Sequence, residues 1–483
     1  RFNPKALHVD FYDLSPAERD ILPYEFRAEP LVSWKNRSIE VSAKGQAYYG
    51  GGMSAEFGSN FVTTHSIPRE PIVSLAAFQH SFANGFEMTR PKYGYGTLNA
   101  REPMLPQIAH AIGNSMAPPM MSADRTEGSI SGGRAMADHS YLANRELWDA
   151  WFLSGIAPQS SNSHPATVNQ KNIATGFFEG TRSLPVVRYQ RDLDGKKPGD
   201  VVNSLFTGST SSAAGIRDVA SHLRVDGLFN VNSTSVEAWK AMLGSLKGRQ
   251  IVVRNAAGAE SIVTNGETPV ANLAAPENII AKGTGSVDVK EADQWVGRRS
   301  LSDDEIDSLA RAVVKEVRKR GPFLSLADFV NRRVGTDREL ARAGAIQNAL
   351  DSDEVAINSA YNSGRSVSTS TANRFAFKEA EEGPLAYGSP GVVKQADILT
   401  PIAPVLSARS DSFIIRAYGE SVDANGKVTA RAWCEAVVER NRNFVDLSDK
   451  AETAINNLTR EANRVLGRSY QLVSFRWLNS AEV

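Results

Sequence analysis

Residues 412–440 read SFIIRAYGESVDANGKVTARAWCEAVVER. Two runs rich in β-branched and aromatic residues, 412–420 and 428–440, flank the four-residue segment DANG at 423–426. Asn-Gly between two strand-like runs is typical of a tight hairpin, because both residue types tolerate positive φ angles. This stretch therefore predicts an antiparallel β-hairpin near the end of the chain.

The second strand of this hairpin alternates between two kinds of side chain. One side carries small or branched apolar residues: Val428, Ala430, Ala432, Cys434, Ala436 and Val438. The other side carries Thr429, Arg431, Trp433, Glu435, Val437 and Glu439. A side built from small residues predicts close packing against a helix, with Cys434 as a small buried hydrophobe. A helix over residues 450–466, stopped by Gly467, and a last strand over 470–478 complete the predicted region.

Residues 221–360 contain the clearest helical signals of the chain. A Ser or Thr followed three positions later by an acidic residue is the sequence signature of a capping box at a helix start. Four such pairs occur: Thr234 with Glu237, Ser302 with Glu305, Ser325 with Asp328, and Thr336 with Glu339. Apolar residues at helical spacing follow each pair, so we expect four helices here.

The rest of the chain is less regular. Residues 1–220 alternate short apolar stretches with Gly, Pro, Ser and Asn, and only 72–83 and 138–155 have helical patterns. Residues 361–400 are polar and are expected to form a surface excursion. We therefore predict an α+β protein with three parts, at 1–220, 221–360 and 361–483.

Composition narrows the classes of function. The chain has 483 residues, with 54 Lys plus Arg and 54 Asp plus Glu, so its formal net charge is zero. A nucleic-acid binder needs surplus positive charge, and this balance argues against one. Only one cysteine is present, so no intrachain disulfide is possible. No apolar run of 18 residues occurs, and an anchor or export signal is expected to precede Arg1.

Catalytic and metal motifs are missing from the sequence. It has no G-x-S-x-G nucleophile elbow and no H-E-x-x-H pair, and a single cysteine excludes thiolate zinc clusters. No catalytic residue and no cofactor are therefore expected. The only calcium candidates are Asp351, Asp353 and Glu354, and a solvated charge cluster is favoured there because calcium takes six or more oxygen ligands.

Several large aromatic residues stand out instead as apolar anchors. Tryptophan and phenylalanine bury more surface than other side chains and dominate both cores and subunit interfaces. We expect this role for five of them: Trp239, Phe323, Phe329, Trp433 and Trp477.

Two segments of the helical region resemble a known family. Residues 229–235 read FNVNSTS and residues 321–329 read GPFLSLADF. An N-x-N-S/T turn before a helix, followed later by G-x-F-x-S-x-x-D-F, is similar to the helical domain of the type II secretion minor pseudopilin K family (general secretion pathway protein K). Related helix-hairpin-helix modules share the first half, but the Gly-Ile-Gly hairpin of their DNA-binding versions is absent here.

A second resemblance covers more of the chain. The Verru_Chthon cassette protein A family is similar in five segments, at residues 63–71, 108–115, 142–149, 404–413 and 431–438. This resemblance implies a large protein encoded beside small pilin-like proteins, and it brings no catalytic residue with it. The pseudopilin resemblance implies a pilin-like sheet with an inserted helical domain. Members of that family often bind calcium, although their ligands have no matching positions here.

Together these features favour a structural role over catalysis. We expect a tip or scaffold subunit of a type II secretion or type IV pilus-like assembly in the bacterial cell envelope, which binds smaller pilin-like partners. A self-assembling extracellular filament or surface-layer subunit is the first alternative. An envelope hydrolase of unrecognised type is the second, and it would require His65, His110 or His139 to converge with carboxylates.

Overall fold

The computed structural model describes residues 39–41, 47–49, 72–79, 112–130, 134–156, 170–254, 260–263, 266–270, 299–359, 375–381, 392–451, 453 and 455–482. Helices and strands are both well represented there, which confirms the mixed α+β class. The chain divides into two compact units. Unit 1 combines Arg1–Gly155 with Phe229–Ala408, and unit 2 combines Ile156–Leu228 with Arg409–Val483. These boundaries differ from those expected near residues 220 and 360.

Helix α7 (Asp303–Arg320) forms the centre of unit 1. The Ser302 hydroxyl accepts the amide of Glu305 at 3.3 Å, and the Glu305 carboxylate accepts the amide of Ser302 at 2.9 Å. This confirms the predicted capping box. Three acidic residues in the first turn and three basic residues in the last also favour the helix dipole. Helices α6 (Val236–Leu243) and α10 (Ala345–Leu350) pack against α7.

Two of the predicted helix starts are wrong by one residue. Helix α6 is capped by the Ser235 hydroxyl rather than by Thr234. Helix α9 (Arg338–Arg342) is capped by the Asp337 carboxylate rather than by Thr336. In both cases the residue after the threonine is itself a strong cap and lies closer to the free amides of the first turn. The predicted start at Ser325 is confirmed, because its hydroxyl accepts an amide of helix α8 (Leu326–Val330).

The two helices expected in the first part of the chain are shorter than predicted. Residues 72–79 contain only the 3-10 turn η2 (Leu75–Phe78), and residues 80–83 lie outside the described ranges. Helix α2 (His139–Leu147) starts as expected after Asp138 but ends eight residues early. Trp151 and Phe152, which suggested further turns, are 42% and 40% exposed, so no burial supports a longer helix.

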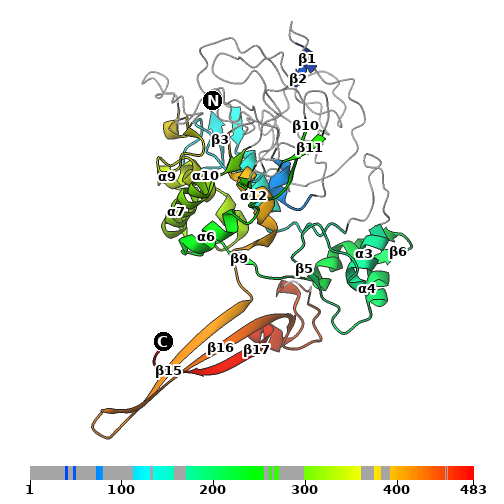
Figure 1. The fold of residues 1–483 in the computed structure, drawn as a ribbon, viewed down its shortest axis with the longest axis vertical. Helices are drawn as coiled ribbons and strands as arrows, with labels where there is room; N and C mark the ends of the chain where they lie inside the picture. The colour runs from blue at the N-terminus through cyan, green and yellow to red at the C-terminus, as the bar shows by residue number, and fades with distance from the viewer. Residues whose placement is uncertain are drawn as a thin grey trace. The chain divides into compact units, whose positions relative to one another are not determined.

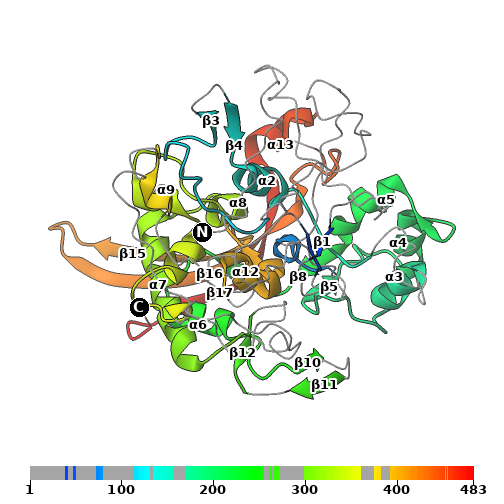
Figure 2. The same cartoon turned by 90° about the horizontal axis from the view of Figure 1, so that it is seen from above.

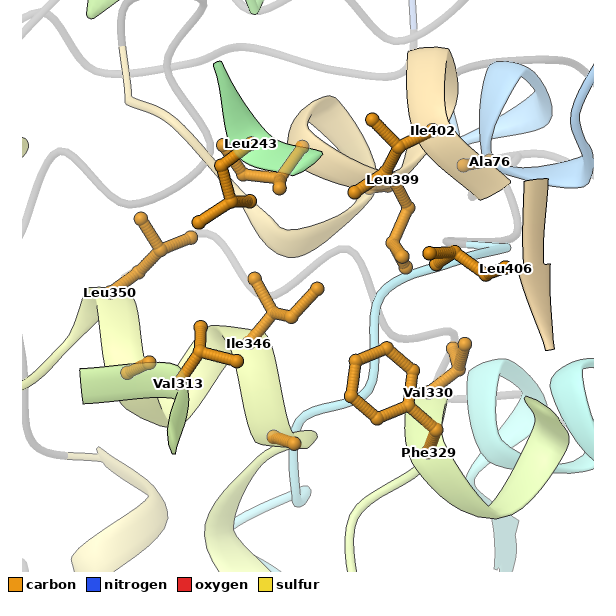
Figure 3. Close-up of a cluster of buried hydrophobic side chains, with 14 of the residues drawn as sticks. Ala76, Leu243, Val313, Phe329, Val330, Ile346, Leu350, Leu399, Ile402 and Leu406 are labelled. Carbon is orange, nitrogen blue, oxygen red and sulfur yellow. The ribbon is translucent and has the colours of Figure 1, made fainter. Parts of the chain in front are cut away.

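The core of unit 1 brings these short helices together. Figure 3 shows side chains from α6, α7, α8, α10 and α12 (Gln395–Ile402) directed toward one another. Two further helical segments described in the unit are η6 (Lys378–Glu381) and η7 (Ala403–Val405). Helices of five to eight residues are unstable alone, so their stability comes from this shared burial.

Buried carboxamides connect segments that are distant in sequence. The amides of Gln347 and Gln395 each donate to the side-chain oxygen of the other residue, at 3.1 and 3.0 Å. Asn358 likewise accepts from the Val393 amide and donates to its carbonyl, both at 2.9 Å. Each pair mimics the exchange of a β-ladder, so buried backbone groups that have no partner within a helix or sheet stay hydrogen-bonded.

The strands of unit 1 occur only in small two-stranded ribbons within the described residues. Four ribbons are antiparallel, and they pair β1 (Ile39–Val41) with β2 (Ala47–Tyr49), β3 (Glu127–Ile130) with β4 (Arg134–Ala137), β10 (Ile251–Arg254) with β11 (Glu260–Val263), and β12 (Thr268–Pro269) with β13 (Ser300–Leu301). The parallel ribbon joins β9 (Phe229–Asn230) to β14 (Leu406–Ser407). It links segments that lie roughly 180 residues apart.

Unit 2 has a helical part and a sheet part. The helical part contains α3 (Gln170–Glu179), α4 (Pro198–Leu205), α5 (Ala213–Asp218), η3 (Val219–His222) and the short strands β5 (Tyr189–Arg191), β6 (Phe206–Thr207), β7 (Thr210–Ser211) and β8 (Leu223–Val225). Strand β5 pairs with β8, and β6 pairs with β7. Phe177, Phe178 and Val201 are buried between α3 and α4.

The sheet part of unit 2 has the order β15-β16-β17, and all its pairs are antiparallel. Strands β15 (Ser412–Val422) and β16 (Val428–Phe444) form the predicted hairpin, which is confirmed, and β17 (Arg468–Leu478) is the predicted last strand. Only Gly426 has a positive φ in the turn, at 80°, and the Asp423 carboxylate accepts two amides there. The hairpin end extends beyond β17 (Figures 1 and 2).

The helix expected over residues 450–466 is mostly absent. The described residues form only a 3-10 turn, η8 (Ile455–Asn457), and a short helix, α13 (Glu461–Leu466). The Asp449 carboxylate explains this difference, because it accepts the amides of Thr459 and Arg460 and thereby fixes a loop before the helix. Gly467 ends the helix as predicted, with a φ of 72°.

Candidate docking surface

The strand register sorts the three-stranded sheet of unit 2 into two unlike faces. Residues paired across neighbouring strands point to the same face, and successive residues point to opposite faces. Phe413, Val438 and Leu472 are aligned across the sheet, as are Ile415, Ala436 and Phe475. These residues belong to the face that we call the apolar face: Phe413, Ile415, Ala417, Gly419, Ser421, Ala430, Ala432, Cys434, Ala436, Val438, Tyr470, Leu472, Phe475 and Trp477.

The apolar face is open along its whole length. Its large side chains are 37% to 68% exposed, with Phe413 lowest and Trp477 highest. At about 200 Å² per large side chain, the six largest leave roughly 650 Å² of apolar surface uncovered. The largest apolar patch on a typical monomer is about 300–600 Å², and bigger patches mark interaction sites.

The apolar face has a distinct relief. Small residues form a floor on β15 and β16: Ala417, Gly419, Ser421, Ala430, Ala432, Cys434 and Ala436. Large residues of β17 form a ridge that lies beside the floor only at the levels of Ala436 and Cys434: Tyr470, Leu472, Phe475 and Trp477. The rings of Phe475 and Trp477 meet edge to face at 5.4 Å, which supports the ridge. Phe413 and Ile415 limit the floor at the end distant from the hairpin turn.

The opposite face of the sheet, which we call the polar face, carries charged residues, although Ile414, Tyr418 and Val422 are also exposed there. Arg416, Glu435 and Arg476 lie side by side on the three strands. The Glu435 carboxylate accepts from Arg416 Nε at 2.8 Å and from Arg476 Nε at 2.9 Å. These two hydrogen bonds lower the pKa of Glu435. Charged side chains of the three strands thus lie on this face, apart from residues near the sheet end such as Arg440.

The position of Cys434 corrects one prediction. The expectation was a buried residue on a side covered by a helix, but no described element of the chain covers this side, and Cys434 is only half-buried. Ala430 and Ala432 are exposed on the same side. The alternation was therefore correct from Ala430 to Val438, but a register shift pairs Val428 with Val422 of the other face. The covering helix is absent from the described residues.

The five predicted aromatic anchors lie in three different settings. Trp239 and Phe329 stack in the core of unit 1 with their ring centroids 5.9 Å apart, and Phe323 meets Phe329 edge to face at 5.2 Å. All three are almost completely buried. Trp433 is half-buried on the polar face of the sheet, whereas Trp477 stands on the ridge of the apolar face.

Apart from Trp477, which was expected as an anchor, the ridge is the part of this surface that sequence patterns missed. Leu472 and Phe475 share a face although three positions separate them, because Val473 forms a bulge between the pairs of Leu472 and Ser474. Simple alternation through residues 470–478 would place Tyr470 and Leu472 opposite Phe475 and Trp477. The aromatic and aliphatic content of the strand was the available signal.

The three calcium candidates do not form a closed site. Asp351 caps the end of α10 and accepts from Gln347 Nε2 at 3.1 Å, while Glu354 pairs with Lys315 at 2.5 Å. Asp353 is exposed. In the described part of the chain, no three His, Cys, Asp or Glu side chains are grouped so that they could hold a metal ion.

The histidines named for a hydrolase are only partly described. His65 and His110 lie outside the described residues, and His139 is the first residue of α2. Among the described helices, none has the length and apolar character to cross a membrane.

Comparison with known proteins gives no further guide: no protein-family model, curated protein or solved structure matches this chain.

Proposed function

We propose that this protein is a non-enzymatic structural subunit of a bacterial envelope assembly, and that it binds smaller pilin-like proteins through the apolar face of its sheet. The assembly would belong to the type II secretion or type IV pilus-like class. The three-stranded antiparallel sheet would be the pilin-like part, and the helices around α7 would be the inserted domain.

One observation carries this proposal: the apolar face is large and uncovered. Exposed apolar surface of roughly 650 Å² approaches the ~800 Å² that each partner contributes to a standard protein interface. Aromatic side chains such as Phe475 and Trp477 are also the residue types that are enriched in interfaces. Binding a partner would remove this surface from water, at about 25 cal/mol per Å².

The two segments that resemble the pseudopilin K family meet through one contact. Asn232, from the first of the two similar segments, donates to the Phe323 carbonyl at 3.0 Å and accepts the Phe323 amide at 2.6 Å. Phe323 belongs to the second segment, so the two segments meet through this pair. The residues that define the resemblance thus act as one structural unit.

Affinity purification from cross-linked envelopes tests the proposal. The tagged full-length chain should retain small proteins with prepilin-type N-terminal segments, identified by mass spectrometry. Replacing Trp477 with Ser should reduce their recovery, whereas replacing Trp433 with Phe, on the other face, should not.

Recovery of no pilin-like protein from intact envelopes would contradict the proposal. Long homopolymers of the purified chain, seen by electron microscopy, would support a self-assembling filament instead.

A further inference from the structure

Strand β15 lies at one edge of the three-stranded sheet and is open along its whole length (Figure 1). All 11 of its residues are exposed, and in the described part of the chain only β16 pairs with it. Natural proteins commonly protect an edge strand with lysine, proline or a bulge. Strand β15 contains neither residue type, and the extra residue of the bulge near the hairpin turn is Thr429 on β16. The outer edge of β15 is therefore a template for one more strand.

The side chains that β15 places on the polar face form a pattern that is complementary to its own reverse. In chain order they are apolar, basic, aromatic, acidic and apolar: Ile414, Arg416, Tyr418, Glu420 and Val422. Two antiparallel copies centred on Tyr418 place Arg416 of each opposite Glu420 of the other. The same register places Ile414 opposite Val422, and both side chains are more than half exposed. Opposite charges and apolar pairs directly across an antiparallel ladder are stabilising.

We infer that the outer edge of β15 binds the same edge of a second copy of this chain, antiparallel and centred on Tyr418, so that two three-stranded sheets join into one. The contact uses the same residues on both copies, so it closes as a two-fold dimer. The axis is perpendicular to the sheet, and both apolar faces therefore lie on the same side and stay uncovered. The inference is independent of the proposed function and goes beyond it, because it sets how many copies present the apolar face.

The charges of the polar face support this register across the whole joined sheet. At one level each copy has the row Arg476, Glu435 and Arg416, in which the central carboxylate pairs with both arginines. At the next charged level Glu420 lies opposite Arg431. The dimer brings the first row of one copy into line with the second row of the other. Signs then alternate over five neighbouring strands, and no like charges lie directly opposite each other.

Other registers of the same edge lose this match. Moving the centre by one residue in either direction places Arg416 opposite Tyr418 or opposite Val422 of the other copy. Both pairs of opposite charges are then lost. Parallel strands in register would place Arg416 beside its own counterpart, and like charges directly opposite each other are destabilising. The antiparallel register centred on Tyr418 is thus favoured over its neighbours.

The other edge of the sheet, β17, is a poorer candidate. Its only charged residues are Arg468 and Arg476, so pairing with itself cannot join opposite charges, and it carries a bulge. Antiparallel pairing of β15 with β17 of another copy could match Glu420 with Arg476. Arg416 would then lie beyond Leu478, the last residue of β17, and only one charge pair would form. That contact is also open-ended and would produce chains instead of a dimer.

Two charge-reversal variants test the register through their mixture. Arg416→Glu and Glu420→Arg each bring like charges together at both contacts of a homodimer. Each should raise the dimer dissociation constant about tenfold or more, measured on the full chain by sedimentation velocity. In an equal mixture of the two variants, a mixed dimer again joins opposite charges at both contacts, so association should return to within about threefold of the parent. Any folding defect of either variant persists in the mixture, so restored folding cannot produce this recovery.

Cysteine cross-linking reads the register directly in a Cys434→Ser background. Tyr418→Cys should form an intermolecular disulfide on mild oxidation, because residue 418 lies opposite itself with the Cβ atoms about 5 Å apart. Val422→Cys is the matched control on the same face. Its two copies would lie eight residues apart along the ladder, roughly 27 Å, and should not cross-link. Circular dichroism establishes that each variant is folded.

Four results would overturn the inference. These are a parent chain that stays monomeric at about 0.1 mM, a mixture that associates no better than either charge variant alone, equal cross-linking of Tyr418→Cys and Val422→Cys, and a dimer that Trp477→Ser dissociates. The last result would place the contact on the apolar face. Recovery of pilin-like proteins from envelopes is measured separately, so failure of the dimer leaves the proposed function in place.

Discussion

Asn232 is a single residue that joins three parts of unit 1. Its side-chain amide donates to the carbonyls of Phe323 and Ala408, and its oxygen accepts the amide of Phe323. We expect Asn232→Ala to lower the free energy of unfolding by about 2–3 kcal/mol, because partly buried backbone groups would lose their partners. Urea denaturation followed by circular dichroism measures the change.

Asn230 supplies the matched control for that substitution. It belongs to the same motif, but it is exposed and its side chain accepts only the local amide of Asn232. Asn230→Ala should therefore lower the free energy of unfolding by less than about 1 kcal/mol. Equal losses for the two variants would show that the bridge to Phe323 adds no stability.

His222 makes the stability of unit 2 depend on pH. Burial lowers the pKa of its imidazole, and the nearby cations Lys196 and Arg442 act in the same direction, against the carbonyl and carboxylate of Asp192. The unfolded chain, with a pKa of about 6.5, then binds the proton more readily than the folded chain. The stabilisation from neutral His222 is full above pH 6.5 and is lost as the pH falls.

Thermal unfolding between pH 8 and pH 5 checks this dependence. The midpoint should fall on acidification in the parent chain, and His222→Gln should remove part of that fall. Because Asp192 also faces this ring and its own pKa is lowered, measurements below pH 5 would mix the two groups. An NMR titration that places the His222 pKa at or above 6.5 would refute the assignment.

At the scale of an element, substitutions at the start of helix α6 test which residue caps it. The Ser235 hydroxyl accepts the amide of Ala238 at 3.2 Å, and we expect Ser235→Ala to cost about 1 kcal/mol of unfolding free energy. Thr234→Ala, one position earlier, should change it by less than about 0.5 kcal/mol. The reverse order in urea denaturation would restore Thr234 as the cap.

Elements governed by neighbouring residues were predictable from sequence. The hairpin at residues 412–440, the capping box of α7 and the stop at Gly467 all follow from local chemistry. The bulge at Val473 was not predictable, because it depends on the register with β16 rather than on the strand itself. The long helix expected before Gly467 failed for a similar reason, since Asp449 accepts amides ten residues away.

The candidate site was only half predictable. Alternation along β16 correctly identified a side of small residues, but sequence alone could not show whether another segment of the chain covers it. That question depends on long-range packing, which also decides how residues 156–228 and 409–483 combine into unit 2.

At the scale of the whole molecule, the open apolar face should govern colloidal behaviour. Replacing Phe475 and Trp477 together with Ser should raise the solubility limit and reduce the binding of the dye ANS, because this removes two exposed rings. The melting temperature should change little, since half or more of each side chain is already in water. Unchanged dye binding would mean that the exposed apolar surface lies elsewhere.

The parallel pairing of β9 with β14 cannot form until late in the synthesis of the chain. Its two strands are roughly 180 residues apart, and ribosomes add about 5–20 residues per second. Some 10–35 seconds therefore pass between the emergence of Phe229 and that of Leu406, during which α6 and α7 lack part of their final packing. During that interval the nascent chain exposes apolar surface that the finished core buries, so this is the stage at which it is most prone to aggregate.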